Sequence, residues 1–292
     1  MSVDMMSEVE NTTSGLGRSN SIVVRFAFIL VVLLVFIILL QLGMTALSWI
    51  LGPNGSPHLI DGMVNGNEMV VFDQDPSGNG AVPILRSDNQ RGGIEFTWSI
   101  WLYVNADKDH STYRHIFSKG NPEQYAKKYE VNMPPPEKTG VMYPNNAPGL
   151  YLAPHTNNLL LIMNSFSTID EEIEIENIPL NKWFNVIIRV KNNSLDVFMN
   201  GIIAKSRQLP TPPKQNYDKV FMHLNNGFSG YSSNLWYWNY SIGTSTVTSI
   251  VEAGPNTTIT GGPTADLNAS YLSSKWYFAG QGDMFNPTGY SG

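Results

Sequence analysis

Hydrophobic side chains follow two different patterns along this chain. Between Phe26 and Leu51 they run without a charged residue, and Gln41 is the only strongly polar side chain. From about residue 66 onward, short apolar runs alternate with Gly, Pro, Asn and Asp. The first pattern is typical of a membrane-spanning helix, and the second predicts a body built from short strands.

The first apolar run is long enough to cross a membrane. Roughly 20 such residues span a hydrocarbon core of about 30 Å, and a helix satisfies its backbone hydrogen bonds internally. We therefore predict a transmembrane helix over residues 21–51, with Phe26 and Leu40 inside the span and Trp49 near an interface. The polar segment 1–20 has the composition of disorder. A cleaved signal peptide is the alternative, but the run is longer than a normal signal core and no A-x-A site follows it.

The second pattern predicts strands separated by turns, which indicates a sandwich or a barrel. The expected strands are Glu68–Asp73, Ile94–Val104, His115–Ser118, Gly149–Ala153, Asn158–Asn164, Glu172–Glu176, Lys182–Val190, Leu195–Met199, Ile202–Ala204, Lys219–Asn225 and Ser233–Asn239. One helix is expected over Ser245–Ala253, with Val247, Ile250 and Val251 on one face.

The stretch "IPLNKWFNVIIRVKNNSLDVFMNG" shows the strand pattern best. Trp183 opens a strand whose alternate residues are apolar, and the polar turn 191–194 returns the chain into Leu195–Met199. Asn200-Gly201 is a strong two-residue hairpin signal because both residues accept a positive φ. This stretch therefore predicts a meander of three antiparallel strands.

Composition narrows the function classes. The chain has 292 residues, a net charge of −6 and no cysteine. Its longest basic run is Lys127-Lys128, so it lacks the basic stripe that nucleic-acid binding requires. Without cysteine there is no disulfide framework, no thiolate metal site and no Cys nucleophile.

Five ordered motifs carry a resemblance to a known family. They are "FTWSIWLYV", "HIFSKGN", "GLYLAPHTNNLLLIM", the meander stretch above and "GFSGYSSNLWYWNYSIGTSTVTSIVEAGP". Their order over residues 94–255 resembles the concanavalin A-like lectin/glucanase family, also called laminin G-like. The resemblance implies an all-β, two-sheet antiparallel jelly-roll sandwich. We place the sandwich at 67–256, a linker at 52–66 and a docking tail at 257–292.

The segments "GIEFTWSIWLYV" and "LWYWNYSIG" are most similar to members of this family that large DNA viruses, particularly algal ones, encode. The resemblance implies a minor capsid or virion membrane protein that is anchored in the internal membrane and, during assembly, in a host endomembrane. Its expected partners are the lipid bilayer and capsid or other virion proteins. A carbohydrate-binding module for host attachment is the alternative, and a glucanase is a third possibility.

The segment "EIEIE" is the strongest candidate for catalysis. In a strand, Glu172, Glu174 and Glu176 point to one face, and paired carboxylates are the groups a glycosidase uses. The glucanase branch of the family, however, has an aspartate at the centre of its acidic strand and places that strand elsewhere in the order. A solvated acidic edge that deters strand pairing is the favoured interpretation. No enzyme activity and no cofactor are expected.

A calcium loop is the main candidate for a metal site. Asp73, Asp75 and Ser77 provide oxygens and Gly78 a turn, but Ile84 stands where a bidentate Glu is needed. The histidines show no zinc-binding spacing. We therefore predict a plain loop and no metal.

Aromatic residues are the remaining candidates for binding. On a strand, Trp236 and Trp238 share one face while Tyr237 takes the other. One face belongs to the core; the other either contacts a sugar or a partner protein, or is covered by the chain itself. Possible contact residues are Trp236, Tyr237, Trp238 and Tyr240, together with Trp276, Tyr277 and Phe278 in the tail.

Two features bear on the orientation in the membrane. Arg18 and Arg25 precede the span and the next basic residue is Arg86, so the positive-inside rule puts the sandwich across the membrane from the cytosol. A virion protein that meets the capsid shell is expected on the cytosolic face, so the two arguments conflict. Glycosylation at the sequons of Asn192, Asn239, Asn256 and Asn268 tests which holds.

Overall fold

The structure is a computed structural model, and it describes residues 22–51, 54–78, 80–87, 90–106, 110–120 and 138–259. The chain divides into two compact units, Met1–Pro53 and Asn54–Gly292. The first unit contains the helix α2 (Ile22–Leu51). The second unit is built mainly of strands.

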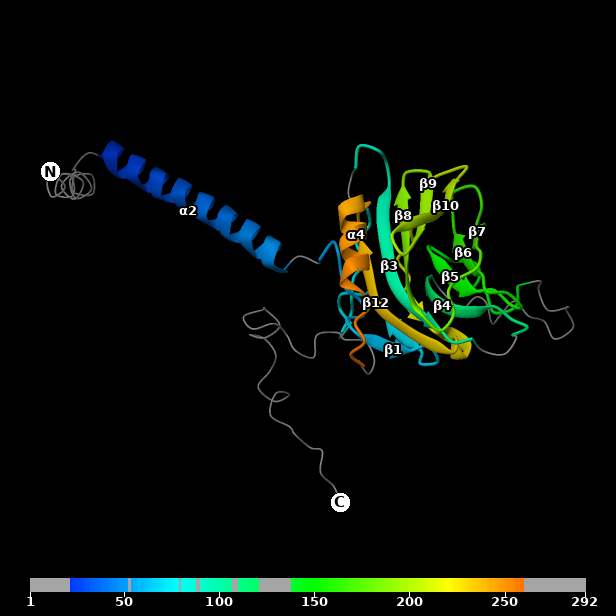
Figure 1. The fold of residues 1–292 in the computed structure, drawn as a ribbon. Coiled ribbons are helices and arrows are strands. Elements are labelled where there is room, and N and C mark those ends of the chain that lie inside the picture. The colour runs from blue at the N-terminus through cyan, green and yellow to red at the C-terminus, as the bar shows by residue number, and fades with distance from the viewer. Residues whose placement is uncertain are drawn as a thin grey trace, which may run out of the picture. The chain divides into compact units, whose positions relative to one another are not determined.

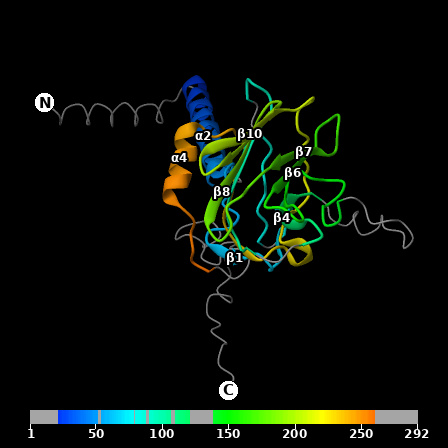
Figure 2. The same cartoon turned by 45° about the vertical axis from the view of Figure 1, so that its right-hand side comes forward.

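The strand unit consists of two antiparallel sheets, which lie face to face (Figures 1 and 2). Sheet A has the order β1-β12-β3-β8-β9-β10, and its strands are β1 (Met63–Asn65), β3 (Glu95–Val104), β8 (Trp183–Lys191), β9 (Ser194–Met199), β10 (Ile202–Gln208) and β12 (Gly230–Trp238). Sheet B has the order β2-β11-β4-β5-β6-β7, and its strands are β2 (Val70–Phe72), β4 (Arg114–Lys119), β5 (Gly149–Leu152), β6 (Leu159–Met163), β7 (Glu171–Ile175) and β11 (Val220–Met222). A short 3-10 helix, η1 (Leu224–Asn226), follows β11. The predicted all-β two-sheet sandwich, preceded by an N-terminal apolar helix, is confirmed.

The core lies between the sheets and follows from strand alternation. In β3, Trp98, Ile100 and Leu102 point inward and are at most 1% exposed. The Trp98 ring centroid lies 5.5 Å from that of Phe117 and 4.8 Å from that of Tyr237, so both sheets contribute to the contact. Burying one such side chain stabilises the fold by roughly 1.5–3 kcal/mol.

The predicted meander is β8, β9 and β10. Asn192 in the first turn has a φ of 53°, and Asn200 and Gly201 in the second have φ values of 49° and 81°. Those left-handed angles match the right-handed strand twist, which is why Asn-Gly suits this turn. The third strand continues to Gln208, four residues beyond the prediction.

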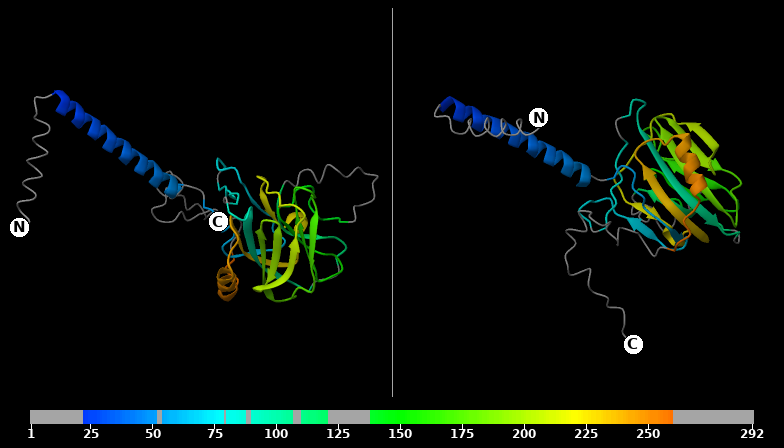
Figure 3. Two further views of the ribbon diagram at one scale, coloured as in Figure 1. Left: turned by 90° about the horizontal axis from the view of Figure 1, so that it is seen from above. Right: turned by 60° about the vertical axis from the view of Figure 1, so that its left-hand side comes forward.

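The helix α4 (Thr244–Ala253) begins one residue before the predicted Ser245. It covers part of the outer face of sheet A (Figure 3), where Val247 packs with Ile187, Phe198 and Trp238. Ile250 packs partly against the same cluster. The predicted apolar face of this helix is therefore the face that docks.

The segment predicted as a linker, 52–66, differs from that prediction where the structure describes it. Leu59, Ile60 and Val64 are each 1% exposed and belong to the core. The Leu59 amide donates to the Leu235 carbonyl at 2.8 Å, and β1 pairs with β12. The apolar residues of this segment are too few and too scattered to show the alternation of a strand. Their place in the sheet depends on pairing with β12, which the local sequence does not indicate.

Candidate binding surfaces

The side chains of α2 are exposed over Ile22–Leu47, apart from the half-buried Val24. Its stretch Ile22–Leu47 has 26 residues and a mean hydropathy of 3.3, and none of its most apolar window is buried. Twenty-six residues rise about 39 Å, more than a hydrocarbon core of about 30 Å requires. Phe26 and Leu40 are 68% and 46% exposed, while the side chain of Trp49 lies outside the described side chains. A membrane span and a signal sequence both fit this description.

The aromatic residues of β12 are largely covered by the chain itself. Tyr237 is fully buried between the sheets, and its hydroxyl donates to the Leu85 carbonyl at 2.7 Å. Trp238, 4% exposed, lies under α4. Trp236 stacks on Trp238 at 4.8 Å and on His58 at 4.5 Å between ring centroids. These side chains therefore hold α4 and the 54–58 segment on sheet A.

Among the four members of the predicted group that the structure describes, Tyr240 is the exposed one, at 40%. Its carbonyl accepts a hydrogen bond from the Thr97 hydroxyl at 3.0 Å, which fixes the backbone there. Trp276, Tyr277 and Phe278 lie outside the described residues. Whether any of these residues contacts a ligand stays a prediction.

A second aromatic group lies on the outer face of sheet A, and sequence reasoning missed it. Tyr103 pairs with Trp183 on one side and with Tyr231 on the other. The centroid distances are 5.6 Å and 6.3 Å, and Tyr231 is 37% exposed. We call these three residues the aromatic triad. The outward direction of Tyr103 follows from alternation, but its two aromatic neighbours depend on strand register.

The outer face of sheet B is covered by the segment 138–148. Val141 and Met142 pack on Tyr151, Leu160 and Ile162. The Tyr151 hydroxyl accepts from the Met142 amide at 3.2 Å and donates to Asn146 Oδ1 at 2.5 Å. The segment 138–148 therefore packs on this face, whereas residues 121–137 lie outside the described ranges.

Glu172 and Glu174 of β7 point outward as predicted, while Ile173 and Ile175 point into the core. Glu171, at the start of the strand, is 6% exposed. β7 is an edge strand of sheet B. Glu172 forms an ion pair with Lys138, and Glu174 accepts from Asn158 Nδ2 at 2.7 Å.

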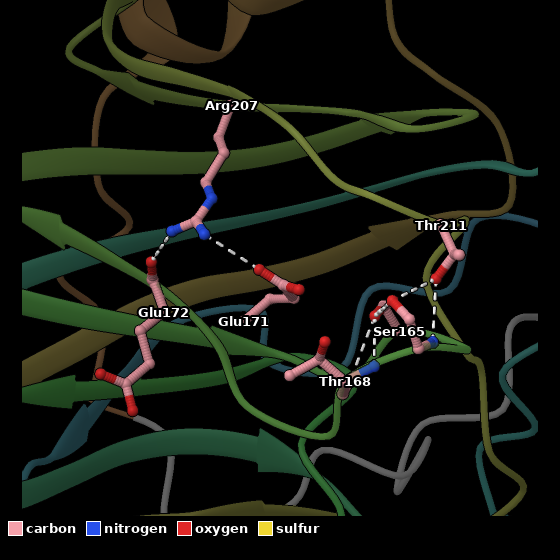
Figure 4. A network of polar contacts seen from close by, with 7 residues as sticks. Ser165, Thr168, Glu171, Glu172, Arg207 and Thr211 are labelled. Carbon is pink, nitrogen blue, oxygen red and sulfur yellow. Dashed lines mark hydrogen bonds and ion pairs between the residues drawn. The ribbon is translucent and has the colours of Figure 1, made fainter.

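Neighbouring contacts close the same side of the sandwich. Arg207 of β10 binds Glu171 at 3.0 Å and the Glu172 carbonyl, which links the edges of the two sheets (Figure 4). Ser165 and Thr168 bond to each other within the loop between β6 and β7, and the Ser167 amide of that loop donates to Thr211 Oγ1 at 2.9 Å, which ties it to the segment after β10 (Figure 4). The carboxylates of this strand are thus engaged in contacts within the chain, whereas the acidic-edge interpretation expected them to be solvated.

The loop Asp73–Gly78 is held by its own hydrogen bonds. Asp73 Oδ1 accepts from the Asp75 amide at 3.1 Å, and Asp75 Oδ1 accepts from the Ser77 hydroxyl at 2.7 Å. Lys219 lies 2.8 Å from Asp73 Oδ2, and its hydrogen bond lowers the pKa of Asp73. Within the described ranges, no three His, Asp or Glu side chains converge to hold a metal.

An open groove of about 840 Å³ runs beside this loop along β2 and β11. Val71 and Phe221 form its apolar floor, and charged side chains of both signs line its walls. Asp73 and Lys219 neutralise each other there.

Two histidines are buried as neutral imidazoles between β4 and η1. His115 Nδ1 accepts from the Leu224 amide at 3.2 Å, so its Nε2–H donates to the Ser118 hydroxyl at 2.8 Å. His223 Nδ1–H donates to the Glu68 carbonyl, and its Nε2 accepts from the Ser232 hydroxyl, both at 2.8 Å. Burial lowers the pKa of His115 to about 3, with His223 adding to the effect. Burial likewise lowers the pKa of His223 to about 4, although the Glu68 carbonyl opposes the shift.

Comparisons with known proteins give a distant structural likeness alone. No family model and no curated protein matches the chain. Similar solved structures include the receptor-binding domain of botulinum neurotoxin D, with a TM-score of 0.44 and 10% identity over 68% of this chain and 52% of that one. The serotype G binding domain gives a TM-score of 0.41 and 11% identity over 65% and 46%. A serotype D ligand-binding domain in complex with N-acetylneuraminic acid gives 0.44 and 10% over 68% and 51%. This chain thus spans about half the length of those structures, and likeness at this level carries no conclusion about function.

Proposed function

We propose that this chain is a single-pass membrane protein whose β-sandwich acts by binding rather than by turnover, as a structural protein of a large DNA virus. α2 anchors it in the internal membrane of the virion, and the sandwich contacts capsid or other virion proteins. The observation that carries the membrane role is the exposed apolar helix joined to a folded body. The virion setting rests on the sequence resemblance over residues 94–255.

Two structural features support binding over hydrolysis. The outward carboxylates Glu172 and Glu174 are engaged by Lys138 and Asn158, so neither is poised as a free acid or nucleophile. The outer face of sheet B, in addition, is covered by the 138–148 segment. Both features suit a scaffold better than a substrate cleft.

The edge strand β10 offers a surface for a protein partner. All seven of its residues are exposed, and Ile202 and Ile203 are 75% and 51% exposed. An edge strand presents unpaired backbone groups, which a neighbouring chain can pair with. Lys205 on the same strand limits non-specific pairing by charge, whereas Arg207 is engaged by Glu171.

Extraction of purified virions tests the proposal. We expect the chain to stay in the particle through high salt and alkaline carbonate and to leave with detergent, because the span is held by the hydrophobic effect. Proximity crosslinking in intact particles is then expected to join the sandwich to a capsid protein. Absence of the chain from virions, or its release without detergent, contradicts the proposal.

Carbohydrate binding is the second candidate, and the aromatic triad favours it. Exposed aromatic rings stack on the apolar faces of sugars, and Tyr103, Trp183 and Tyr231 form one continuous aromatic surface. A glycan array of the full chain in detergent separates the candidates. Saturable binding that Trp183→Ala abolishes, and that Tyr217→Ala at an exposed tyrosine outside the triad leaves intact, supports recognition of sugars. If the chain binds no glycan on the array, the result favours the structural role over recognition of sugars.

A further inference from the structure

Two polar side chains interrupt the apolar sequence of α2. Over residues 26–47, Gln41 and Thr45 are the only polar side chains. The Thr45 hydroxyl donates to the backbone carbonyl of Gln41 at 2.9 Å, so its proton is used within the helix. Among the residues that the structure describes, none hydrogen-bonds to the side-chain amide of Gln41, which is exposed. Gln41 therefore carries the polar group that α2 itself does not satisfy.

The position of Gln41 puts this amide inside the hydrocarbon of a membrane. At about 1.5 Å per residue, Gln41 lies about 24 Å along the helix from Arg25, the last charged residue before the apolar run, and about 15 Å from Leu51, where α2 ends. A hydrocarbon core of about 30 Å that is aligned with either end still encloses Gln41, by at least about 6 Å.

An amide at this depth needs a partner from another helix. It has two N–H donors and an acceptor oxygen, and lipid chains satisfy neither kind of group, so leaving it unpaired is costly. The backbone groups of α2 are already used by the helix. Polar side chains in this situation favour association with a second span.

The chemistry of the amide identifies a second copy of this chain as the partner. The N–H of one carboxamide donates to the oxygen of the other and accepts in return, so two glutamines related by a two-fold axis satisfy each other. All copies insert with the same end first, so their spans run parallel and place Gln41 at the same depth. An unrelated span meets this condition only if it has a polar residue at that level.

We propose that α2 pairs in parallel with α2 of a second copy, through a hydrogen bond between the two Gln41 side chains. The inference rests on the proposed function, because it takes α2 as a membrane span. It adds that the anchor is a dimer.

The face that meets the second copy follows from helical spacing. Val31, Leu34, Ile38, Gln41 and Thr45 are separated by alternate steps of three and four residues, which is the spacing of a two-helix seam. We call these five residues the Gln41 face. In the single chain Val31, Leu34 and Ile38 are 57%, 51% and 48% exposed, so the seam is open to a partner. Thr45 is small, which lets the two backbones approach closely.

The opposite face of α2 offers the competing arrangement. Gly43 lies about 200° around the helix from Gln41, and a Cβ added to it would meet nothing within 4 Å. Glycine also favours close approach of membrane helices, but this face has no polar group to satisfy. Leu39 lies beside Gly43 on the same side. The two faces therefore predict different contacts.

Single cysteines distinguish the two faces, because the chain contains no cysteine of its own. The full chain is reconstituted in phosphatidylcholine vesicles and oxidised with copper phenanthroline. We expect disulfide-linked dimers from Ile38→Cys and Thr45→Cys, and none from Leu39→Cys or Gly43→Cys. Crosslinking on the Gly43 side alone, equal crosslinking at all four positions, or none at any position overturns the proposal.

Energy transfer between labelled chains, followed as the vesicles are diluted with lipid, tests the hydrogen bond itself. Gln41→Leu is expected to weaken the dimer about tenfold, whereas Gln41→Asn, which keeps an amide, retains most of the association. Gly43→Leu is the matched control and leaves the dimer unchanged, since the added side chain has open space. Association of Gln41→Leu at the level of the unaltered chain shows the proposal to be wrong.

Carbonate extraction of the same vesicles separates two kinds of failure. A chain that stays integrated but monomeric refutes the dimer and leaves membrane anchoring intact. A chain that washes off refutes the membrane span, and the dimer with it. A photocrosslinker at residue 38 in intact virions identifies the occupant: a product with another protein, and none between copies, overturns the second copy as the partner.

Discussion

At the scale of single residues, His115 and His223 make the stability of the sandwich depend on pH. Their pKa values are lowered to about 3 and about 4 in the folded chain, whereas an unfolded histidine titrates near 6.5. Below about pH 6.5 the unfolded chain therefore binds more protons than the folded one. Stability is complete above that pH and is lost as pH falls toward the folded values.

We expect each of these histidines to lower the free energy of unfolding by about 1 kcal/mol between pH 6 and pH 5. Urea titrations monitored by tryptophan fluorescence at several pH values measure this slope. His223→Asn retains a side chain that suits the φ of 54° and can still donate to the Glu68 carbonyl. The variant is expected to reduce the slope by about half in that range, and an unchanged slope would falsify the assignment.

Gly230 is a second residue whose identity the fold constrains. It has a φ of 146°, and a Cβ there would meet the Tyr103 carbonyl oxygen at 1.9 Å. Gly230→Ala must therefore move β12 away from β3, and we expect it to destabilise the sandwich by at least about 2 kcal/mol. Gly92→Ala is the matched control, because its only contact within 4 Å is a side-chain atom, Glu95 Oε1, at 3.3 Å, and no backbone atom blocks the added Cβ. Equal urea midpoints for the two variants would contradict this expectation.

At the scale of elements, the apolar side chains of α2 favour membrane insertion by far more free energy than one charged residue costs. Roughly twenty apolar side chains, at about 0.4 kcal/mol each, favour insertion by roughly 8 kcal/mol, whereas one central arginine costs about 3 kcal/mol. We therefore expect Leu34→Arg alone to remain membrane-integrated. Val31→Arg, Leu34→Arg and Ile38→Arg together are expected to abolish integration, measured as resistance to carbonate extraction.

The corresponding alanine triple variant is the control for α2. It keeps the helix and adds no charge, so it is expected to stay integrated. Release of the single arginine variant, or retention of the triple arginine variant, is the result that contradicts a hydrophobic span.

Elements with a local pattern were predictable. The meander β8–β9–β10 follows from alternation and from Asn-Gly, and α4 follows from one apolar face and a Gly-Pro stop. By contrast, β1 is three residues long and lies in the stretch predicted as a linker. Its strand conformation depends on pairing with β12, which is nearly 170 residues away in sequence.

At the scale of the whole molecule, the sequons report which side of the membrane carries the sandwich. Asn192 is exposed in the β8–β9 turn, whereas Asn239 is 5% exposed. Asn256 Nδ2 donates to Asp61 Oδ1 at 3.0 Å, and Asn268 lies outside the described residues. Asn192 is therefore the most accessible acceptor among the three described sequons.

If the sandwich enters the secretory lumen, we expect a glycan at Asn192 that Ser194→Ala removes, seen as a loss of the glycosidase-sensitive mass shift. Ser241→Ala is expected to leave the shift unchanged, because Asn239 is buried. A chain without any glycan places the sandwich on the cytosolic face, which the virion proposal requires for contact with a capsid shell. Protease protection in sealed vesicles checks the same point independently.

Local features of the sequence determined the division into an apolar helix and a two-sheet body, because apolar length and strand alternation are properties of consecutive residues. The inward face of β3 and the outward carboxylates of β7 follow from that alternation. Tertiary structure decided which outward residues meet. Tyr103, Trp183 and Tyr231 come from three strands. Strand register and loop docking are set by contacts between distant residues, and these bring the three residues of the aromatic triad together.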